Sequence, residues 1–101
     1  MQSVIHGMLQ EEKQRNLEMQ AAYRQEINGL RKGSIKKKVI SGCSYYYLKY
    51  RQEGQVKDIY LGKDESIINE IRREIEKRKY LQSVLKRLEQ EHKEISKIIK
   101  D

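Results

Sequence analysis

The sequence contains no proline, tryptophan or phenylalanine, and it has a single cysteine, Cys43. Without proline, nothing forces a break inside a helix, and tyrosine must carry all of the aromatic chemistry. One cysteine excludes a disulfide within the chain, so a reducing compartment is expected. No apolar run approaches the roughly 20 residues that span a bilayer, and the segment MQSVIHGMLQEEK lacks the features of a signal peptide. We therefore expect a soluble, cytoplasmic protein.

Catalytic motifs are also absent. The sequence contains no GxxxxGK[ST], GxGxxG, HExxH, CxxC or GxSxG pattern. Its two histidines, His6 and His92, lie at opposite ends of the chain, and neither has a second metal ligand at a suitable spacing. Cys43 is interpreted as an ordinary strand residue. These absences predict a protein that is not an enzyme and that needs no metal and no cofactor.

Charge is abundant and unevenly distributed. Charged and apolar residues each make up 37% of the chain, which suits long helices with a narrow apolar stripe. Residues 31–63 include nine basic and two acidic residues and so carry the whole net charge of +7, while the remaining 13 basic and 13 acidic residues cancel. Such a segment favours anionic partners, with nucleic acid ahead of an acidic protein or a membrane surface.

Two stretches have helical periodicity. Residues 4–31 are predicted to form a helix, with Met19, Tyr23, Ile27 and Leu30 on one face. Residues 64–99 are predicted to form a longer helix, capped at its start by Asp64 or Ser66. Pairs four residues apart, Glu74 with Arg78 and Glu89 with Lys93, are expected to support the second helix. Its apolar stripe continues as a heptad seam, which requires a partner helix. The proposed packing residues are Ile71, Ile75, Leu81, Leu85, Leu88 and Ile95.

Residues 33–63, between the helices, show strand-like alternation. We predict three antiparallel strands: Ser34–Ile40, Cys43–Tyr50 and Val56–Leu61. Ser41-Gly42 is typical of a two-residue hairpin turn, and Arg51–Gln55 reads as a longer loop. The whole chain is then a single α+β domain, residues 1–101, in the order α-β-β-β-α. Its two long helices form an antiparallel, coiled-coil-like stalk with an inserted three-stranded antiparallel β meander.

The middle strand divides its tyrosines between two faces, because side chains alternate along a strand. Tyr46, Leu48 and Tyr50 are expected to pack inwards with Ile59 and Leu61. Outward-facing tyrosine rings can stack on bases while lysine ammonium groups contact phosphates. An exposed basic sheet can also serve only to prevent aggregation. The predicted nucleic-acid-binding residues are Lys36, Lys37, Lys38, Tyr45, Tyr47, Lys49, Arg51, Lys57 and Tyr60.

The motifs KGSIKKKVISG and YYYLKYRQEGQVKDIYLGK, followed by a helix, resemble short proteins of unknown function from Gram-positive bacteria and their phages or mobile elements. The resemblance covers roughly residues 30–90 and implies a mobile-element setting. In shape, the predicted sheet is similar to the three-stranded sheet with which some integrases contact DNA. Anti-CRISPR inhibitors from the same setting are similar in size and in having no catalytic motif, although the acidic, DNA-mimicking kind differs from this basic chain.

Two functions remain open from the sequence. The first is a non-enzymatic protein that binds RNA, DNA or a nucleoprotein, most specifically an anti-CRISPR-type inhibitor of a Cas9-like RNA-guided nuclease. The alternative is a coiled-coil interaction module, with a possible homodimer through the second helix, or a DNA-binding accessory protein. Neither function involves a membrane.

Overall fold

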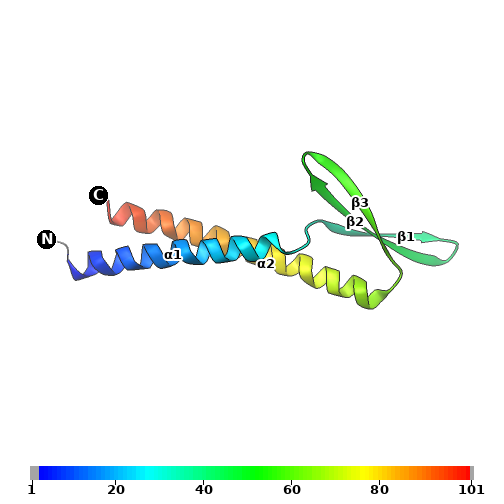
Figure 1. Cartoon of the computed structure of the whole chain (residues 1–101), viewed down its shortest axis with the longest axis horizontal. Helices are drawn as coiled ribbons and strands as arrows, with labels where there is room; N and C mark the ends of the chain where they lie inside the picture. The colour runs from blue at the N-terminus through cyan, green and yellow to red at the C-terminus, as the bar shows by residue number, and fades with distance from the viewer. Residues whose placement is uncertain (1–2, 101) are drawn as a thin grey trace. The chain divides into compact units, whose positions relative to one another are not determined.

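The computed structural model describes residues 3–100 and has an α+β fold in the order α-β-β-β-α, as predicted (Figure 1). Its elements are α1 (Val4–Asn28), β1 (Ser34–Ile40), β2 (Cys43–Gln52), β3 (Gln55–Gly62) and α2 (Glu65–Ile98). The predicted boundaries differ from these by at most three residues. The chain divides into two compact units: a sheet unit of residues 30–79, and a helix unit of residues up to 29 together with those from 80 onward.

The three strands form an antiparallel meander in the order β1-β2-β3. The predicted two-residue turn is present at Ser41-Gly42, where φ is 52° and 80°. Positive φ at both positions matches the right-handed twist of a hairpin. The prediction of a long second loop is wrong, because Gln52 pairs with Gln55 and only Glu53-Gly54 lie between them. Gly54 adopts φ 78° without strain, because it has no side chain. Glu53 is held at φ 52° by the pairing of Gln52 with Gln55 on either side of the turn.

The core of the sheet unit lies on the inward face of β2. Tyr46 and Leu48 are buried, and Tyr50 is half-buried, as the alternation of the sequence predicts. Leu48 packs with Ile71 and Ile75 of α2. The helix stabilises the sheet because it removes the apolar face of β2 from water.

The neighbouring strands complete this core unequally. Ile35 of β1 and Leu61 of β3 pack against it. The prediction that Ile59 is also packed inwards is wrong, since 46% of its surface is exposed. Ile59 pairs with Leu48 and therefore shares its face, but burial on that face is concentrated on β2 and the end of β3.

The segment before β1 fits closely against the sheet unit. Gly33 has φ +122°, and a Cβ atom there would collide with the carbonyl oxygen of Lys49 and lie 3.0 Å from Cβ of Tyr50. Glu74 of α2 accepts hydrogen bonds from the backbone N–H of Arg31 at 2.6 Å and from its guanidinium at 3.1 Å. These contacts fix the path of the chain into β1.

The helix unit contains a polar seam that the sequence analysis did not predict. Asn16 and Gln20 of α1 are buried, whereas Met19, which was assigned to the apolar face, is 40% exposed. The Asn16 amide donates to the carbonyl oxygen of Leu88 at 2.9 Å, and the Gln20 amide donates to Asn16 at 2.7 Å. The prediction for Met19 is wrong because the face of α1 that packs against α2 contains Asn16, Gln20 and Ile27, at spacings of four and seven residues. Met19 lies beside this face.

An arginine extends this polar chain to the surface. Arg24 donates to Gln20 at 3.0 Å and contacts Glu89 of α2 at 3.4 Å. The structure therefore pairs Glu89 with a residue of α1. Satisfied polar groups in a helix pair favour one alignment over others, because any shift leaves buried amides without partners.

The apolar stripe of α2 is divided between the two units. Ile71 and Ile75 pack against the sheet. Leu81 and Leu88 are buried in the helix unit, where Leu85 and Ile95 are half-buried. The single seam expected along the second helix thus covers two different surfaces, because the meander needs its own apolar cover.

Candidate functional site

The outward face of the sheet follows directly from the strand register. Tyr47 lies opposite both Lys36 of β1 and Tyr60 of β3, while Tyr45 lies opposite Lys38. Residues directly opposite in a sheet share a face, and alternation extends this face along β2. This surface, the tyrosine face, includes Ser34, Lys36, Lys38, Ile40, Cys43, Tyr45, Tyr47, Lys49, Arg51, Val56, Asp58 and Tyr60.

The three tyrosines of this face form one aromatic cluster. The ring centres of Tyr47 and Tyr60 are 5.3 Å apart with an interplanar angle of 54°, and those of Tyr45 and Tyr60 are 6.4 Å apart at 41°. The three rings are therefore inclined to one another and do not lie in one plane. Together with Ile40 they line an open depression of about 260 Å³, which we call the notch.

Two lysines lie over the cluster. The ammonium of Lys38 is 4.7 Å from the ring centre of Tyr47, and that of Lys63 is 4.7 Å from the ring centre of Tyr45. A hydrogen bond with Tyr45, and next the charge interaction with the same side chain, raise the pKa of Lys63 above its ordinary value. Lys63 is therefore a cation at neutral pH. Each end of the aromatic cluster carries a positive charge.

A β-bulge positions the second of these lysines. Tyr47 pairs with Tyr60, but Tyr46 pairs with Gly62, so Leu61 is an extra residue in β3. Continuing the shifted register by one position brings Lys63 opposite Tyr45. Lys63 was absent from the residues predicted to bind nucleic acid, because the sequence gives no sign of the bulge apart from Gly62, which has φ +99°.

The structure separates the predicted basic residues into two groups. Lys36, Lys38, Lys49 and Arg51 lie on the tyrosine face. Lys37 lies opposite Tyr46 and Lys57 lies opposite Tyr50, so both are on the other face of the sheet. Lys57 donates there to the side chain of Gln52 at 3.3 Å. One flat ligand on the tyrosine face would contact the first group and not the second.

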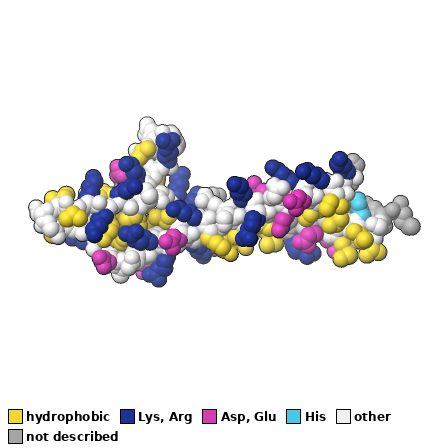
Figure 2. Space-filling model, turned by 180° about the vertical axis from the view of Figure 1, so that it is seen from behind, with side chains coloured by type: hydrophobic (Ala, Val, Ile, Leu, Met, Phe, Trp, Pro, Cys, Tyr) yellow, Lys and Arg dark blue, Asp and Glu magenta, His cyan; other side chains and the backbone are white. Residues whose placement is uncertain are grey.

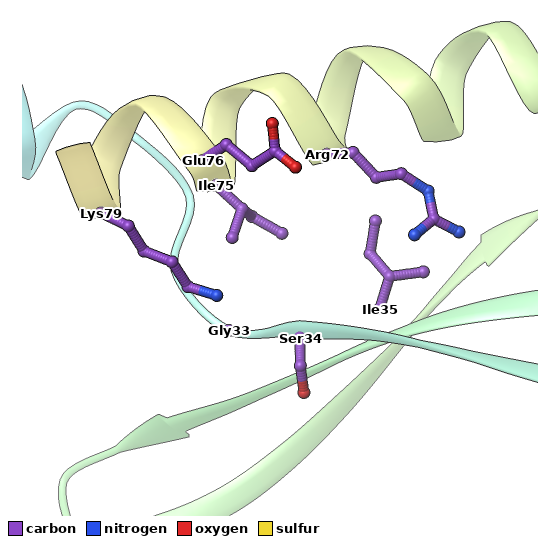
Figure 3. A pocket seen from close by; sticks show the side chains of 7 residues that line it. All are labelled: Gly33, Ser34, Ile35, Arg72, Ile75, Glu76 and Lys79. Atoms are coloured by element: carbon purple, nitrogen blue, oxygen red, sulfur yellow. The ribbon is translucent and has the colours of Figure 1, made fainter.

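A second depression lies in the sheet unit where β1 passes α2. It has a volume of about 170 Å³. Figure 3 shows that Ile35 and Ile75 point towards one another across it, while Ser34 points away from the helix. Arg72 and Lys79 flank this apolar contact, and Glu76 contributes a compensating negative charge. The mixed charge makes this depression a weaker candidate for an anion site than the tyrosine face.

Charge is visible over both units. Figure 2 shows lysine and arginine side chains across the surface, with acidic side chains between them. Within residues 3–100, no three histidine, cysteine, aspartate or glutamate side chains are grouped so that they could hold a metal ion. None of the helices in the described part of the chain is long and apolar enough to cross a membrane.

Comparisons with known proteins place the chain in a family. No curated protein and no solved structure matches it significantly. The family described as a domain of unknown function (DUF6788) matches residues 5–73, a range that includes most of α1, the whole sheet and the first turns of α2. The match agrees with the resemblance to short proteins of unknown function. Since it covers more than half of the sequence, the chain belongs to the family described as a domain of unknown function (DUF6788).

Proposed function

We propose that this protein is a non-enzymatic nucleic-acid-binding protein that uses the tyrosine face. One observation carries the proposal: Tyr45, Tyr47 and Tyr60 lie in contact on one side of the sheet, with the ammonium groups of Lys38 and Lys63 over their rings. Aromatic rings beside basic groups are the combination with which proteins bind bases and phosphates together. Tyr60 is 54% exposed, so its ring is accessible.

The energies of a lysine–tyrosine contact and of base stacking are compatible with binding of a base on the tyrosine face. A cation–π contact at an exposed site, such as that of Lys38 with Tyr47, stabilises by about 0.5–1 kcal/mol. Stacking of a base on an aromatic side chain contributes about 1–3 kcal/mol. A base can therefore displace the ammonium from the ring, and the displaced lysine then becomes available to a phosphate.

Charge reversal on each face tests the proposal. Lys36→Glu with Lys38→Glu changes the tyrosine face, and Lys37→Glu with Lys57→Glu makes the same change in net charge on the opposite face. Binding to labelled single-stranded RNA, single-stranded DNA and duplex DNA is measured at two salt concentrations. We expect the first pair to weaken binding strongly and to reduce the salt slope by about 0.7 per lost single-strand phosphate contact, whereas the second pair has only a small effect.

Equal losses in the two double variants would contradict the proposal, because binding would then depend on net charge and not on the tyrosine face. Circular dichroism of both variants serves as the control for folding. Weak binding of the unmodified protein to all three nucleic acids, without salt dependence, would also contradict it.

The narrower hypothesis, inhibition of a Cas9-like RNA-guided nuclease, stays a prediction, as do the mobile-element setting and the cytoplasmic location. An inhibitor with a basic tyrosine face would have to contact guide RNA, target DNA or an acidic surface of the nuclease. Cleavage of a target DNA, with and without the protein, tests this directly. If the double variant Lys36→Glu with Lys38→Glu still inhibits cleavage, a surface other than the tyrosine face is responsible for the inhibition.

An interaction module remains the second candidate, and one observation favours it. Apolar side chains stay exposed where α1 begins and α2 ends, among them Val4, Ile5, Met8 and Ile98. These two helix ends lie at the same end of the helix unit (Figure 1). Sedimentation of the protein tests the homodimer, and we expect Ile5→Ser with Met8→Ser to abolish any self-association that uses this end. Self-association that persists in this variant would exclude these residues as the interface.

A further inference from the structure

We infer that the notch receives one unpaired base, so that the ligand is a single-stranded nucleic acid lying across the sheet. This inference rests on the proposed function and specifies its ligand. The notch is lined by Ile40, Tyr45, Tyr47 and Tyr60. Three aromatic side chains and one aliphatic side chain provide a surface for the face of a base, and the tyrosine hydroxyls add hydrogen-bonding groups to this lining.

The size of the notch is compatible with one base. Its volume of about 260 Å³ lies just below the roughly 300 Å³ at which pockets for drug-sized ligands begin. This space is appropriate to one heterocyclic ring system. Because the ring planes of Tyr47 and Tyr60 are inclined by 54°, a planar base that stacks on one ring meets the other ring with its edge, which is a favourable aromatic arrangement.

The same geometry disfavours a duplex. Bases in a duplex are stacked on their neighbours, and their faces cannot reach an aromatic side chain. An unpaired base can leave its neighbours and turn its face towards the notch. The ligand class is therefore an RNA or DNA strand with accessible bases.

The two lysines over the rings indicate the path of the nucleic-acid strand across the sheet. Lys38 belongs to β1, and Lys63 directly follows β3. These strands are the two edges of the sheet. Phosphates on either side of the bound base can therefore contact one lysine each, if the nucleic-acid strand crosses the sheet from one edge to the other. Asp58 also lies on this face, but opposite Lys49, two positions beyond Tyr47 along β2.

A matched pair of ligands tests the inference. One is a labelled oligothymidine strand, and the other is a strand of equal length and charge in which abasic sites replace the bases. An oligouridine strand and a duplex of equal length complete the set and distinguish RNA from DNA and single from double strands. We expect the strands with bases to bind about tenfold or more tightly than the abasic strand, and more tightly than the duplex.

Variants then assign the preference to the notch. Tyr60→Ala should remove most of the preference for bases while leaving binding of the abasic strand nearly unchanged. Tyr60→Phe, which keeps the ring, should retain the preference. Tyr80→Ala is the matched control, because Tyr80 is a comparably exposed tyrosine on α2 in the helix unit, 62% exposed, and it should behave as the unmodified protein does.

Three results would overturn the inference. Equal binding of the base-bearing and abasic strands would show that no base enters the notch, and salt-dependent binding of both would still support the proposed function. A preference for bases that survives Tyr60→Ala would place the base elsewhere. Absence of salt-dependent binding to every strand would overturn the inference and the proposed function together.

Discussion

Among the described residues, the helix unit buries polar side chains beside its apolar ones, whereas the buried side chains of the sheet unit are apolar or aromatic. The sheet unit has an apolar cluster of Leu48, Ile71 and Ile75, whereas the helix unit buries the amides of Asn16 and Gln20 to 3% and 4% exposure. Apolar packing gives more stability for each buried group, while a hydrogen-bonded amide discriminates more strongly between alternative alignments. The apolar cluster therefore mainly stabilises the sheet unit, and the buried amides favour one alignment of α1 with α2.

The largest change should come from the apolar core. Leu48→Ala is expected to lower the free energy of unfolding of the sheet unit by about 2–5 kcal/mol, because it leaves a cavity beside Ile71 and Ile75. Urea unfolding followed by tyrosine fluorescence measures this effect, since five of the seven tyrosines lie in residues 31–63. Val39→Thr, at a position with 64% exposure, is the control and should change stability by less than about 0.5 kcal/mol. Equal effects would contradict the assigned core.

Substitution of one glycine in each unit is expected to change stability in opposite directions. Gly33→Ala should destabilise the sheet unit by about 1–3 kcal/mol for the positive φ alone, and further through the collision with Lys49. Gly7→Ala, in α1, should instead stabilise the helix unit by about 0.5–1 kcal/mol, because a Cβ there has no neighbour within 4 Å. Hydrogen exchange of each unit distinguishes the two effects. The same sign for both substitutions would argue against the described path into β1.

The polar seam should respond differently to single and double substitutions. Asn16→Ala is expected to cost about 1–3 kcal/mol, because the Gln20 amide and the Leu88 carbonyl lose a partner in a buried position. Asn16→Leu with Gln20→Leu should be neutral or stabilising, but with less discrimination between alignments and oligomers. Thermal unfolding and sedimentation measure the two properties. A double variant that is less stable than the single one would show that the seam contributes net stability.

The smallest effect concerns the start of α2. Hydrogen bonds from the hydroxyl and then the backbone N–H of Ser66 lower the pKa of Asp64. The carboxylate of Asp64 is therefore protonated less readily in the folded state than in the unfolded state. Its contribution to the free energy of unfolding is complete above the ordinary pKa of 3.8. That contribution is lost as pH falls through the lower pKa of the folded state. Asp64→Asn keeps a capping oxygen without the charge and should show a shallower loss of thermal stability on acidification. Parallel pH profiles would contradict this role.

Local periodicity accounts for the part of the fold that was correctly predicted. Alternation along β2 identified Tyr46 and Leu48 as inward and Tyr45 and Tyr47 as outward, because successive side chains of a strand point to opposite faces. The same alternation separates Lys37 from Lys36 and Lys38 within β1, but it does not say which face of β1 or β3 continues a given face of β2. Lys37 and Lys57 were grouped with the other basic residues by charge, although register places them on the opposite face.

By itself, the sequence determined the order of the elements, the first turn and the two faces of β2, since these depend on neighbours only a few residues apart. The tertiary structure decided which apolar residues of α2 cover the sheet, and which polar residues of α1 are buried. It also decided that Lys63 reaches Tyr45, because the bulge at Leu61 shifts the end of β3 by one position. Such long-range pairings depend on the closure of the sheet and on packing partners that local periodicity does not specify.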